Sequence, residues 1–140
     1  MRKHLEIVYQ LVIFAENLSN MPKKEYKRHM VVYKNHFKEF KKTLSLRTLK
    51  KIYQIFLYIM TLDVVPVTYL KSIAGVAGLY EIRIEDDGNI YRIFCCFDEG
   101  NLVILFNGFQ KKTQKTPQGE IEKAKRIMNE YFESKNKKGE

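Results

Sequence analysis

Apolar residues in the first third of the chain recur at helical spacing. Between Leu5 and Leu18 they lie three or four residues apart, which predicts a helix. A polar stretch, MPKKEYKRH, follows and is typical of a linker. The short apolar run MVVY then predicts a strand from Met30, and residues 35–44 return to helical spacing. Ser45 is a suitable N-cap for a longer helix with a buried stripe of Leu49, Ile52, Ile55, Phe56 and Ile59.

The period of the pattern changes to two in the second half of the chain. We predict strands over Leu79–Glu85, Ile90–Phe97 and Leu102–Phe109. Turn residues stand between these segments, at Asp87-Gly88 and at Gly100-Asn101. The pattern therefore predicts three antiparallel strands joined as a meander.

A last helix completes the predicted fold. Thr116 suits its N-cap and Pro117 its first position, and its inner face is formed by Ile121, Ala124, Ile127, Met128, Tyr131 and Phe132. The order of elements predicts an α+β fold, in which an antiparallel sheet packs against a helical hairpin and carries a C-terminal and an extra N-terminal helix. We divide the chain into an N-terminal helical extension and linker (1–29), one domain (30–134) and a basic, disordered tail (135–140).

The charge of the chain indicates what kind of partner it binds. Its 140 residues include 25 Lys and Arg against 16 Asp and Glu, a formal net charge of +9. An excess of this size on one small domain favours a polyanionic partner, with nucleic acid before an anionic membrane. No apolar run approaches the roughly 18 residues of a membrane span, so we expect no membrane partner.

Neither the N-terminal segment nor the cysteines indicate secretion. Glu6 and Gln10 interrupt the apolar middle of the first segment, which makes it a poor signal peptide. Cys95 and Cys96 are neighbours in a predicted strand, where adjacent side chains point to opposite faces and form neither a disulfide nor a metal pair. We expect two buried thiols in a protein of the cytoplasm.

Two arginines are expected to face each other across the predicted sheet. A hairpin centred on Asp87-Gly88 pairs Arg83 with Arg92, and continuing the register puts Asn107 beside Arg92 if neither hairpin contains a bulge. Like charges opposite each other destabilise a sheet unless an anion lies between them. Glu81, two residues before Arg83 on the same face, is one such anion, and an external phosphate is another.

The connector after the third strand adds Lys111, Lys112 and Lys115 beside this predicted row. Guanidinium and ammonium groups are the usual ligands of phosphate, so these residues suit an RNA backbone, although a solvated turn is the alternative interpretation. Phe109, at the end of the strand, suits stacking on an unpaired base as well as a place in the core. Lys71 is a further candidate for RNA binding.

The usual catalytic motifs are missing from the sequence. It contains no HExxH, CxxC, P-loop or GxGxxG pattern, and His4, His29 and His36 lie in the first third, far in sequence from the arginines. We therefore expect no metal site and no cofactor. A domain that cleaves RNA with these residues must use the substrate's own 2′-hydroxyl, with charge stabilisation supplying most of the effect.

Three stretches of the sequence resemble a known family. GLYEIRI, IYRIFCCF and LFNGFQKKTQKTPQGEIEKA are similar to the RelE/ParE superfamily of bacterial type II toxin–antitoxin toxins, specifically its HigB-like, phage-derived branch. The resemblance covers about Met30 to Phe132. It implies a RelE-like fold and an endoribonuclease that cuts mRNA in the ribosomal A site and so inhibits translation. It also implies a cognate antitoxin, usually a helix-turn-helix DNA-binding protein.

The resemblance also implies a catalytic set. The family's basic strand positions correspond to Arg83 and Arg92, and its basic residues after the last strand to Lys111 and Lys112. Glu81 occupies a position that is basic in some members, and we include it as a candidate base. The family's C-terminal catalytic tyrosine or histidine has no clear equivalent here.

Two other functions stay open at this point. ParE-like members share the fold but inhibit DNA gyrase and lack the basic cleavage set, so two arginines and three lysines favour the ribonuclease. A binding module that grips RNA or an antitoxin without cutting is favoured by the missing acid/base residue.

Overall fold

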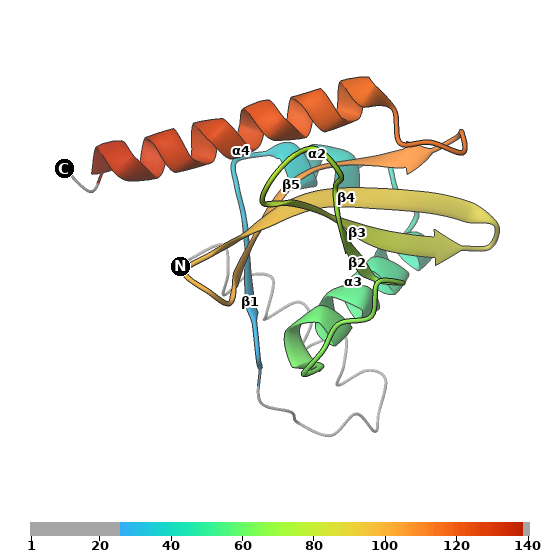
Figure 1. The fold of residues 1–140 in the computed structure, drawn as a ribbon. Helices are drawn as coiled ribbons and strands as arrows, with labels where there is room; N and C mark the ends of the chain where they lie inside the picture. The colour runs from blue at the N-terminus through green and yellow to red at the C-terminus, as the bar shows by residue number, and fades with distance from the viewer. Residues whose placement is uncertain (1–25, 139–140) are drawn as a thin grey trace.

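The computed structural model describes residues 26–138, so the helix expected at residues 5–18 lies outside them. The described part is an α+β fold with five strands and three helices, labelled as in Figure 1. In chain order these are β1 (His29–Val32), α2 (His36–Lys41), α3 (Leu46–Thr61), β2 (Leu70–Ser72), β3 (Leu79–Asp86), β4 (Asn89–Asp98), β5 (Leu102–Lys111) and α4 (Gln118–Lys138). Within residues 26–138, no helix has the length and apolar character needed to cross a membrane.

The five strands form one mixed sheet in the order β1-β5-β4-β3-β2. Its centre is the expected antiparallel meander of β3, β4 and β5. The expectation of a wholly antiparallel sheet is wrong, because β1 runs parallel to β5, with Met30 opposite Val103. The short strand β2 was not expected, and it pairs with β3 through Lys71 opposite Glu81.

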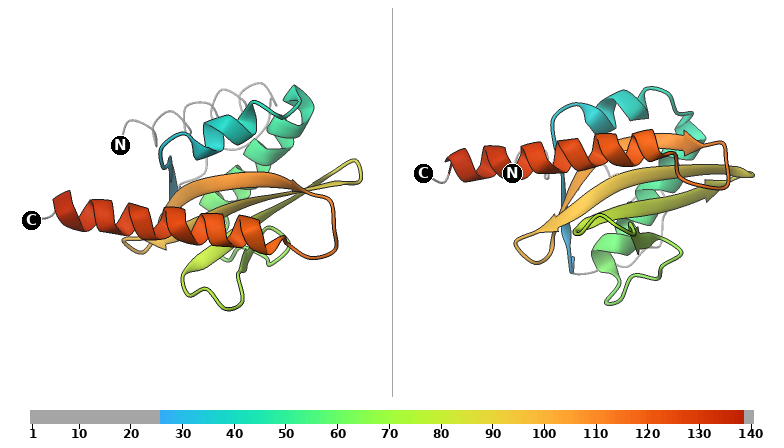
Figure 2. Two further views of the ribbon diagram at one scale, coloured as in Figure 1. Left: turned by 90° about the horizontal axis from the view of Figure 1, so that it is seen from above. Right: turned by 45° about the horizontal axis from the view of Figure 1, so that its top comes forward.

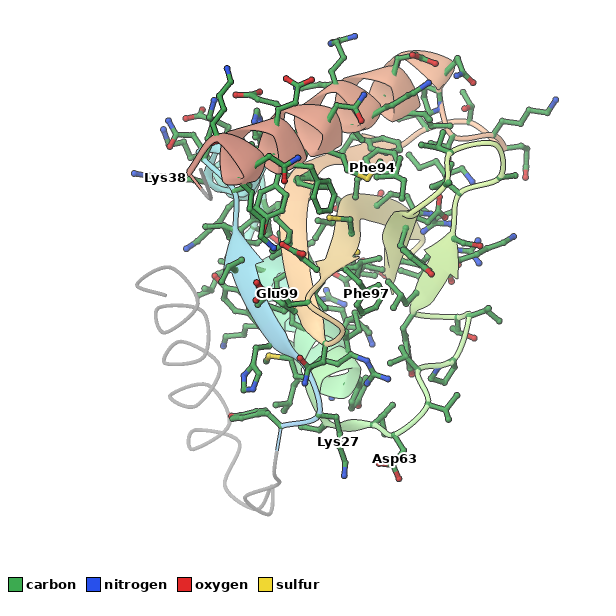
Figure 3. The ribbon with its side chains drawn as sticks, turned by 60° about the vertical axis from the view of Figure 1, so that its left-hand side comes forward. Lys27, Lys38, Asp63, Phe94, Phe97 and Glu99 are labelled. Atoms are coloured by element: carbon green, nitrogen blue, oxygen red, sulfur yellow. The ribbon has the colours of Figure 1, made fainter. Side chains whose placement is uncertain are left out.

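Helices cover both faces of the sheet (Figures 1 and 2). On one face, α2 and α3 enclose a core that includes Phe56, Ile82 and Ile93. On the other face, α4 packs over a second core that includes Phe94 and Phe106 (Figure 3). Successive side chains of β3 and β4 point to the two cores in turn, so both faces of these strands contribute to a core.

The two ends of α3 are each fixed by a side chain. At the start, Ser45 Oγ accepts a hydrogen bond of 3.1 Å from the backbone N–H of Thr48, as expected of an N-cap. At the end, the Arg28 guanidinium donates to the carbonyls of Ile59, Leu62 and Asp63. The carbonyl end of a helix carries a partial negative charge that a cation stabilises. Because Arg28 binds the carbonyls at the end of α3, the segment just before β1 is part of the folded domain rather than a detached linker.

The helix α4 continues beyond the end that we expected for the ordered domain. It runs to Lys138, so residues 135–138 are helical instead of a disordered tail. Lys135 Nζ and Tyr131 OH both donate to Asp98 Oδ2 at the end of β4, over 2.7 and 2.6 Å. These bonds fix the C-terminal part of α4 to the β4–β5 turn, where Glu99 lies (Figure 3).

Both hairpin turns contain residues with the positive φ values that tight turns require. Asp87 and Gly88 have φ values of 52° and 80°, which matches the type I′ turn favoured by an Asp-Gly pair. This turn sets the β3–β4 register, and Arg83 lies opposite Arg92 as expected. The register between β4 and β5 is irregular, since the pair Ile93–Gly108 is followed by the pair Cys95–Leu105. One extra residue of β5 therefore lies opposite Phe94, which constitutes a bulge.

Candidate functional site

Glu81 lies between the two arginines on the sheet face that α4 partly covers. Its Oε2 is 3.3 Å from Arg83 Nε and 3.1 Å from Arg92 Nε. The structure thus supplies the anion that two opposed arginines need. One carboxylate neutralises only one of two cations, so the cluster keeps a net positive charge.

The two arginines differ in their access to solvent. The side chain of Arg92 is 3% exposed, and its Nη1 donates to the carbonyl of Tyr91 over 3.1 Å. Burial lowers the pKa of Arg92, while Glu81 acts in the opposite direction. The side chain of Arg83 is 30% exposed, and its backbone N–H donates to the carbonyl of Tyr69. Arg83 is therefore the member of the pair that an external anion can reach directly.

Asn107 does not belong to the arginine row, so this expectation is wrong. Because of the bulge opposite Phe94, the partner of Arg92 in β5 is Phe109. Asn107 is 2% exposed, and its two polar side-chain atoms have no hydrogen-bond partner among the described residues.

Phe109 lies in the core under α4. It is 9% exposed and stacks on Phe94, with ring centroids 5.7 Å apart and an interplanar angle of 22°. Of the two interpretations open from the sequence, the structure matches the core phenylalanine. Its small exposed surface leaves little of the ring free for a base to stack on.

The lysines of the connector begin where the arginine row ends. Lys111 is the last residue of β5 and lies opposite Ile90. The Ile90–Lys111 pair is two pairs along from the Arg92–Phe109 pair and therefore faces the same side of the sheet. Lys112 and Lys115 follow and are exposed, and the Lys115 carbonyl accepts a hydrogen bond from Thr113 Oγ1 over 2.7 Å. Lys111 is thus a neighbour of the arginine row, as the sequence predicted.

A depression of about 630 Å³ lies beside these lysines. Gly88, Asn89 and Ile90 of the β3–β4 turn form one side, and residues 110–114 form the other. Sequence reasoning missed Asn89 and Gln110, whose side chains bond to each other over 3.2 Å. Asn89 pairs with Asp86 and Gln110 pairs with Tyr91, so both amides lie at the end of the sheet next to the tight turn, and this placement was the available signal.

Lys71 lies on the opposite side of Glu81, Arg83 and Arg92 from the connector lysines. It is exposed on β2 and pairs with Glu81, so it faces the same side of the sheet as the arginines. The histidines lie elsewhere: His29 starts β1, His36 starts α2, and His4 is outside the described residues. Residues 26–138 contain no group of three His, Cys, Asp or Glu side chains that could hold a metal ion.

The two cysteines are buried on opposite faces of β4. Cys95 belongs to the core under α2 and α3, and Cys96 to the core under α4. Both are free thiols, as the sequence predicted. Burial raises the pKa of Cys96 to about 12 and raises the pKa of Cys95 well above its ordinary value, so both thiols are protonated near neutral pH.

A comparison with curated proteins finds no match to this chain. A family model does match, that of the Gp49-like phage-derived proteins (DUF891), over residues 16–129. The match begins before Met30, so it includes part of the segment that we had separated as an extension. It spans the arginine row, the connector and most of α4. The chain therefore belongs to the Gp49-like family of phage-derived proteins, a family of RelE/toxin-like proteins.

Proposed function

We propose that this protein is the toxin of a toxin–antitoxin pair and cleaves mRNA on the ribosome at the face formed by Arg83, Arg92, Lys111 and Lys112. The observation that carries the proposal is the arginine pair. Arg83 is accessible, Arg92 lies buried behind it, and a single carboxylate neutralises only part of their charge. A partly neutralised guanidinium pair beside a lysine is well suited to an RNA phosphate.

The chemistry follows from the groups that are present. The 2′-hydroxyl oxygen of the substrate attacks the adjacent phosphorus, the bond from phosphorus to the 5′ oxygen breaks, and a 2′,3′-cyclic phosphate forms. The 2′-hydroxyl loses its proton and the departing 5′ oxygen gains one. Extra negative charge develops on the phosphate oxygens during this step, and Arg83 and Lys111 would stabilise it most directly.

Glu81 has a positioning role in this proposal. Its side chain is 8% exposed and one of its oxygens is shared between two guanidinium groups. Glu81 keeps Arg92 charged and both guanidinium groups oriented. The solvent-exposed residues Lys71, Lys112 and Lys115 attract the phosphates of the RNA strand.

A non-catalytic binding module is the second candidate function. The tyrosines of β3 and β4, Tyr80 and Tyr91, pack on the face covered by α2 and α3, away from the arginines. Among the described residues, no side chain stands out as a general acid at the arginine face. Such a domain would bind the ribosome or an antitoxin through the same arginines and lysines without cutting RNA.

The test is to add the full chain to a reconstituted translation reaction and to map mRNA ends by primer extension. Cuts within codons that appear only with ribosomes support the proposal. Arrested translation with intact mRNA supports the binding module. Unaffected translation combined with inhibition of DNA supercoiling by gyrase would instead assign the protein to the ParE-like type. A cognate antitoxin added before the mRNA should prevent the cuts.

A further inference from the structure

A second row of side chains follows the arginine row on the same face of the sheet. Glu85 lies opposite Ile90, and Ile90 lies opposite Lys111. Glu85 is two residues along β3 from Arg83, so the two side chains point to the same side of the sheet. Their Cα atoms are about 7 Å apart, the rise of two residues in a strand. The sheet therefore places a carboxylate and an ammonium group on the two sides of Ile90, beside the arginines.

Glu85 is exposed, and its carboxylate is available to a ligand. Within residues 26–138, this carboxylate makes no ion pair and no hydrogen bond. The other carboxylates that the strands place on this face are already engaged. Glu81 is shared between the two guanidinium groups, and Asp98, at the far end of β4, accepts hydrogen bonds from Tyr131 and Lys135. Glu85 is thus the strand carboxylate of this face whose oxygens are open to a substrate.

The face stays cationic although Glu85 belongs to it. Burial lowers the pKa of Arg92, and the negative charges of Glu81 and Glu85 act in the opposite direction. Glu85 is therefore close enough to Arg92 to be part of the same cluster of charges. The two rows together hold three cations (Arg83, Arg92 and Lys111) against the two carboxylates of Glu81 and Glu85, so one positive charge remains to attract a phosphate.

We propose that Glu85 is the catalytic base of the cleavage and accepts the proton of the attacking 2′-hydroxyl. The inference rests on the proposed function, because it takes the scissile phosphate to lie on Arg83. The attacking hydroxyl is on the ribose that carries this phosphate, so its oxygen stays close to the phosphorus. A carboxylate on a flexible side chain two residues from Arg83 can reach a hydroxyl in this position. Lys111, on the other side of Ile90, stabilises the charge of the phosphate.

The proton that Glu85 accepts is returned within the same reaction. As the 2′ oxygen forms its bond to phosphorus, its proton moves to the Glu85 carboxylate, and the bond from phosphorus to the 5′ oxygen breaks. A water molecule donates a proton to the departing 5′ oxygen. The hydroxide that remains takes the proton from Glu85, which restores the carboxylate. Base catalysis of this kind typically contributes about 100- to 10,000-fold to a rate.

The experiment separates cleavage from binding in a reconstituted translation reaction that contains the full chain. The cleavage rate is measured by primer extension under single-turnover conditions. Binding is measured with ribosomes on an mRNA that has 2′-deoxyribose at the mapped cleavage position and so cannot be cut. We expect Glu85→Gln to cleave roughly 100-fold or more slowly than the wild type. It should bind these ribosomes at least as tightly, because it removes a negative charge from a face that binds phosphate.

Two further variants test whether the carboxylate itself is needed. Glu85→Asp keeps a carboxylate on a shorter side chain, so it should cleave faster than Glu85→Gln. Glu133→Gln, the control, removes an exposed carboxylate on α4 and should cleave and bind like the wild type. If Glu85→Gln melts at a lower temperature than the wild type, Glu85→Ala gives the same comparison with a smaller side chain.

The pH dependence of the cleavage rate is a separate sign of a base. A base accepts a proton only in its ionised form, so wild-type cleavage should slow as the pH falls through the titration of a carboxylate. Glu85→Gln should lack this dependence.

The outcomes distinguish the base from the proposed function. If Glu85→Gln cleaves as fast as the wild type, or loses binding as much as cleavage, Glu85 is not the base, and cleavage at the arginine face stands. If the wild type cleaves no mRNA on ribosomes, the proposed function fails and the base fails with it.

Discussion

Glu81 Oε2 lies 3.1 Å from Arg92 Nε in a part of the sheet where both side chains are almost fully buried. A buried charge is tolerated when its partner is present and is costly when the partner is removed. Arg92 has no other carboxylate at ion-pair distance among the described residues. The pair therefore belongs to the fold as much as to the proposed site.

Replacing Glu81 by Gln should strongly destabilise the protein. The substitution keeps the shape of the side chain but leaves the buried Arg92 without its counter-charge. We expect the free energy of unfolding to fall by about 3–5 kcal/mol, measured by urea denaturation. Glu133→Gln is the control, because Glu133 is exposed on α4 and its replacement should change stability by roughly 0.5 kcal/mol or less. Equal stability of the two variants would show that the ion pair contributes little.

Arg28→Gln should shorten or loosen the end of α3. The wild-type guanidinium binds three carbonyls there, and the closest, that of Leu62, is 2.7 Å away. We expect a loss of about 1–2 kcal/mol in stability, from denaturation followed by circular dichroism. Lys27→Gln is the control, since Lys27 and Asp63 form an exposed pair (Figure 3) that contributes at most about 1 kcal/mol. A stable Arg28→Gln variant would return residues 26–29 to the role of a simple linker.

Gly108→Ala should destabilise the sheet through contact with α2. A Cβ built on Gly108 would lie 2.4 Å from Cδ2 of the Phe40 ring, so the ring has to move. Overpacking of this kind costs about 1–3 kcal/mol. In a double-mutant cycle with Phe40→Leu, the Gly108→Ala cost should shrink. An additive result would mean that the ring does not limit this position.

The Asp98 cluster predicts a loss of stability in acid. Burial raises the pKa of Asp98, but hydrogen bonds from Lys135 and Tyr131 outweigh it and leave the pKa below its ordinary value. The stabilisation is therefore complete above about pH 4 and is lost as the pH falls through the lower pKa of the folded state. In Tyr131→Phe the pKa of Asp98 should rise, and stability near pH 7 should fall by about 1 kcal/mol. An NMR titration of the Asp98 carboxyl tests this, and an unchanged pKa would contradict it.

Local patterns in the sequence predicted the centre of the fold. The period-two segments and the Asp87-Gly88 turn place Arg83 opposite Arg92 without further information. The β4–β5 register was predicted wrongly by two residues: next to the turn, Asp98 pairs with Leu102 and not with Asn101, and the bulge opposite Phe94 adds a second residue to β5. Gly108, a glycine inside a strand, was the one available signal of such an irregularity.

Pairings between distant segments could not be predicted in the same way. The strand at Met30 was expected, but its parallel pairing with β5 joins residues that are 73 positions apart, as in the pair Met30–Val103. The three residues of β2 are too few to produce a recognisable period. The buried position of Arg92 depends on packing across the sheet. Sequence reasoning therefore assigned both arginines the same role, and the structure separates them.

The most direct measurement of the proposed function is the rate of ribosome-dependent mRNA cleavage by Arg83→Ala, compared with Lys51→Ala. Arg83 is the accessible arginine, and Lys51 is an exposed residue on α3, on the opposite side of the sheet. Both variants should fold, because neither substitution leaves a buried charge without a partner. In Arg83→Ala, Glu81 is still paired with Arg92, and Lys51 is an exposed residue. Primer extension should reveal wild-type cleavage by Lys51→Ala and a decrease of roughly 100- to 1,000-fold for Arg83→Ala, the loss typical when a group that stabilises developing charge is removed. Equal cleavage by the two variants would contradict an active site at the arginine face.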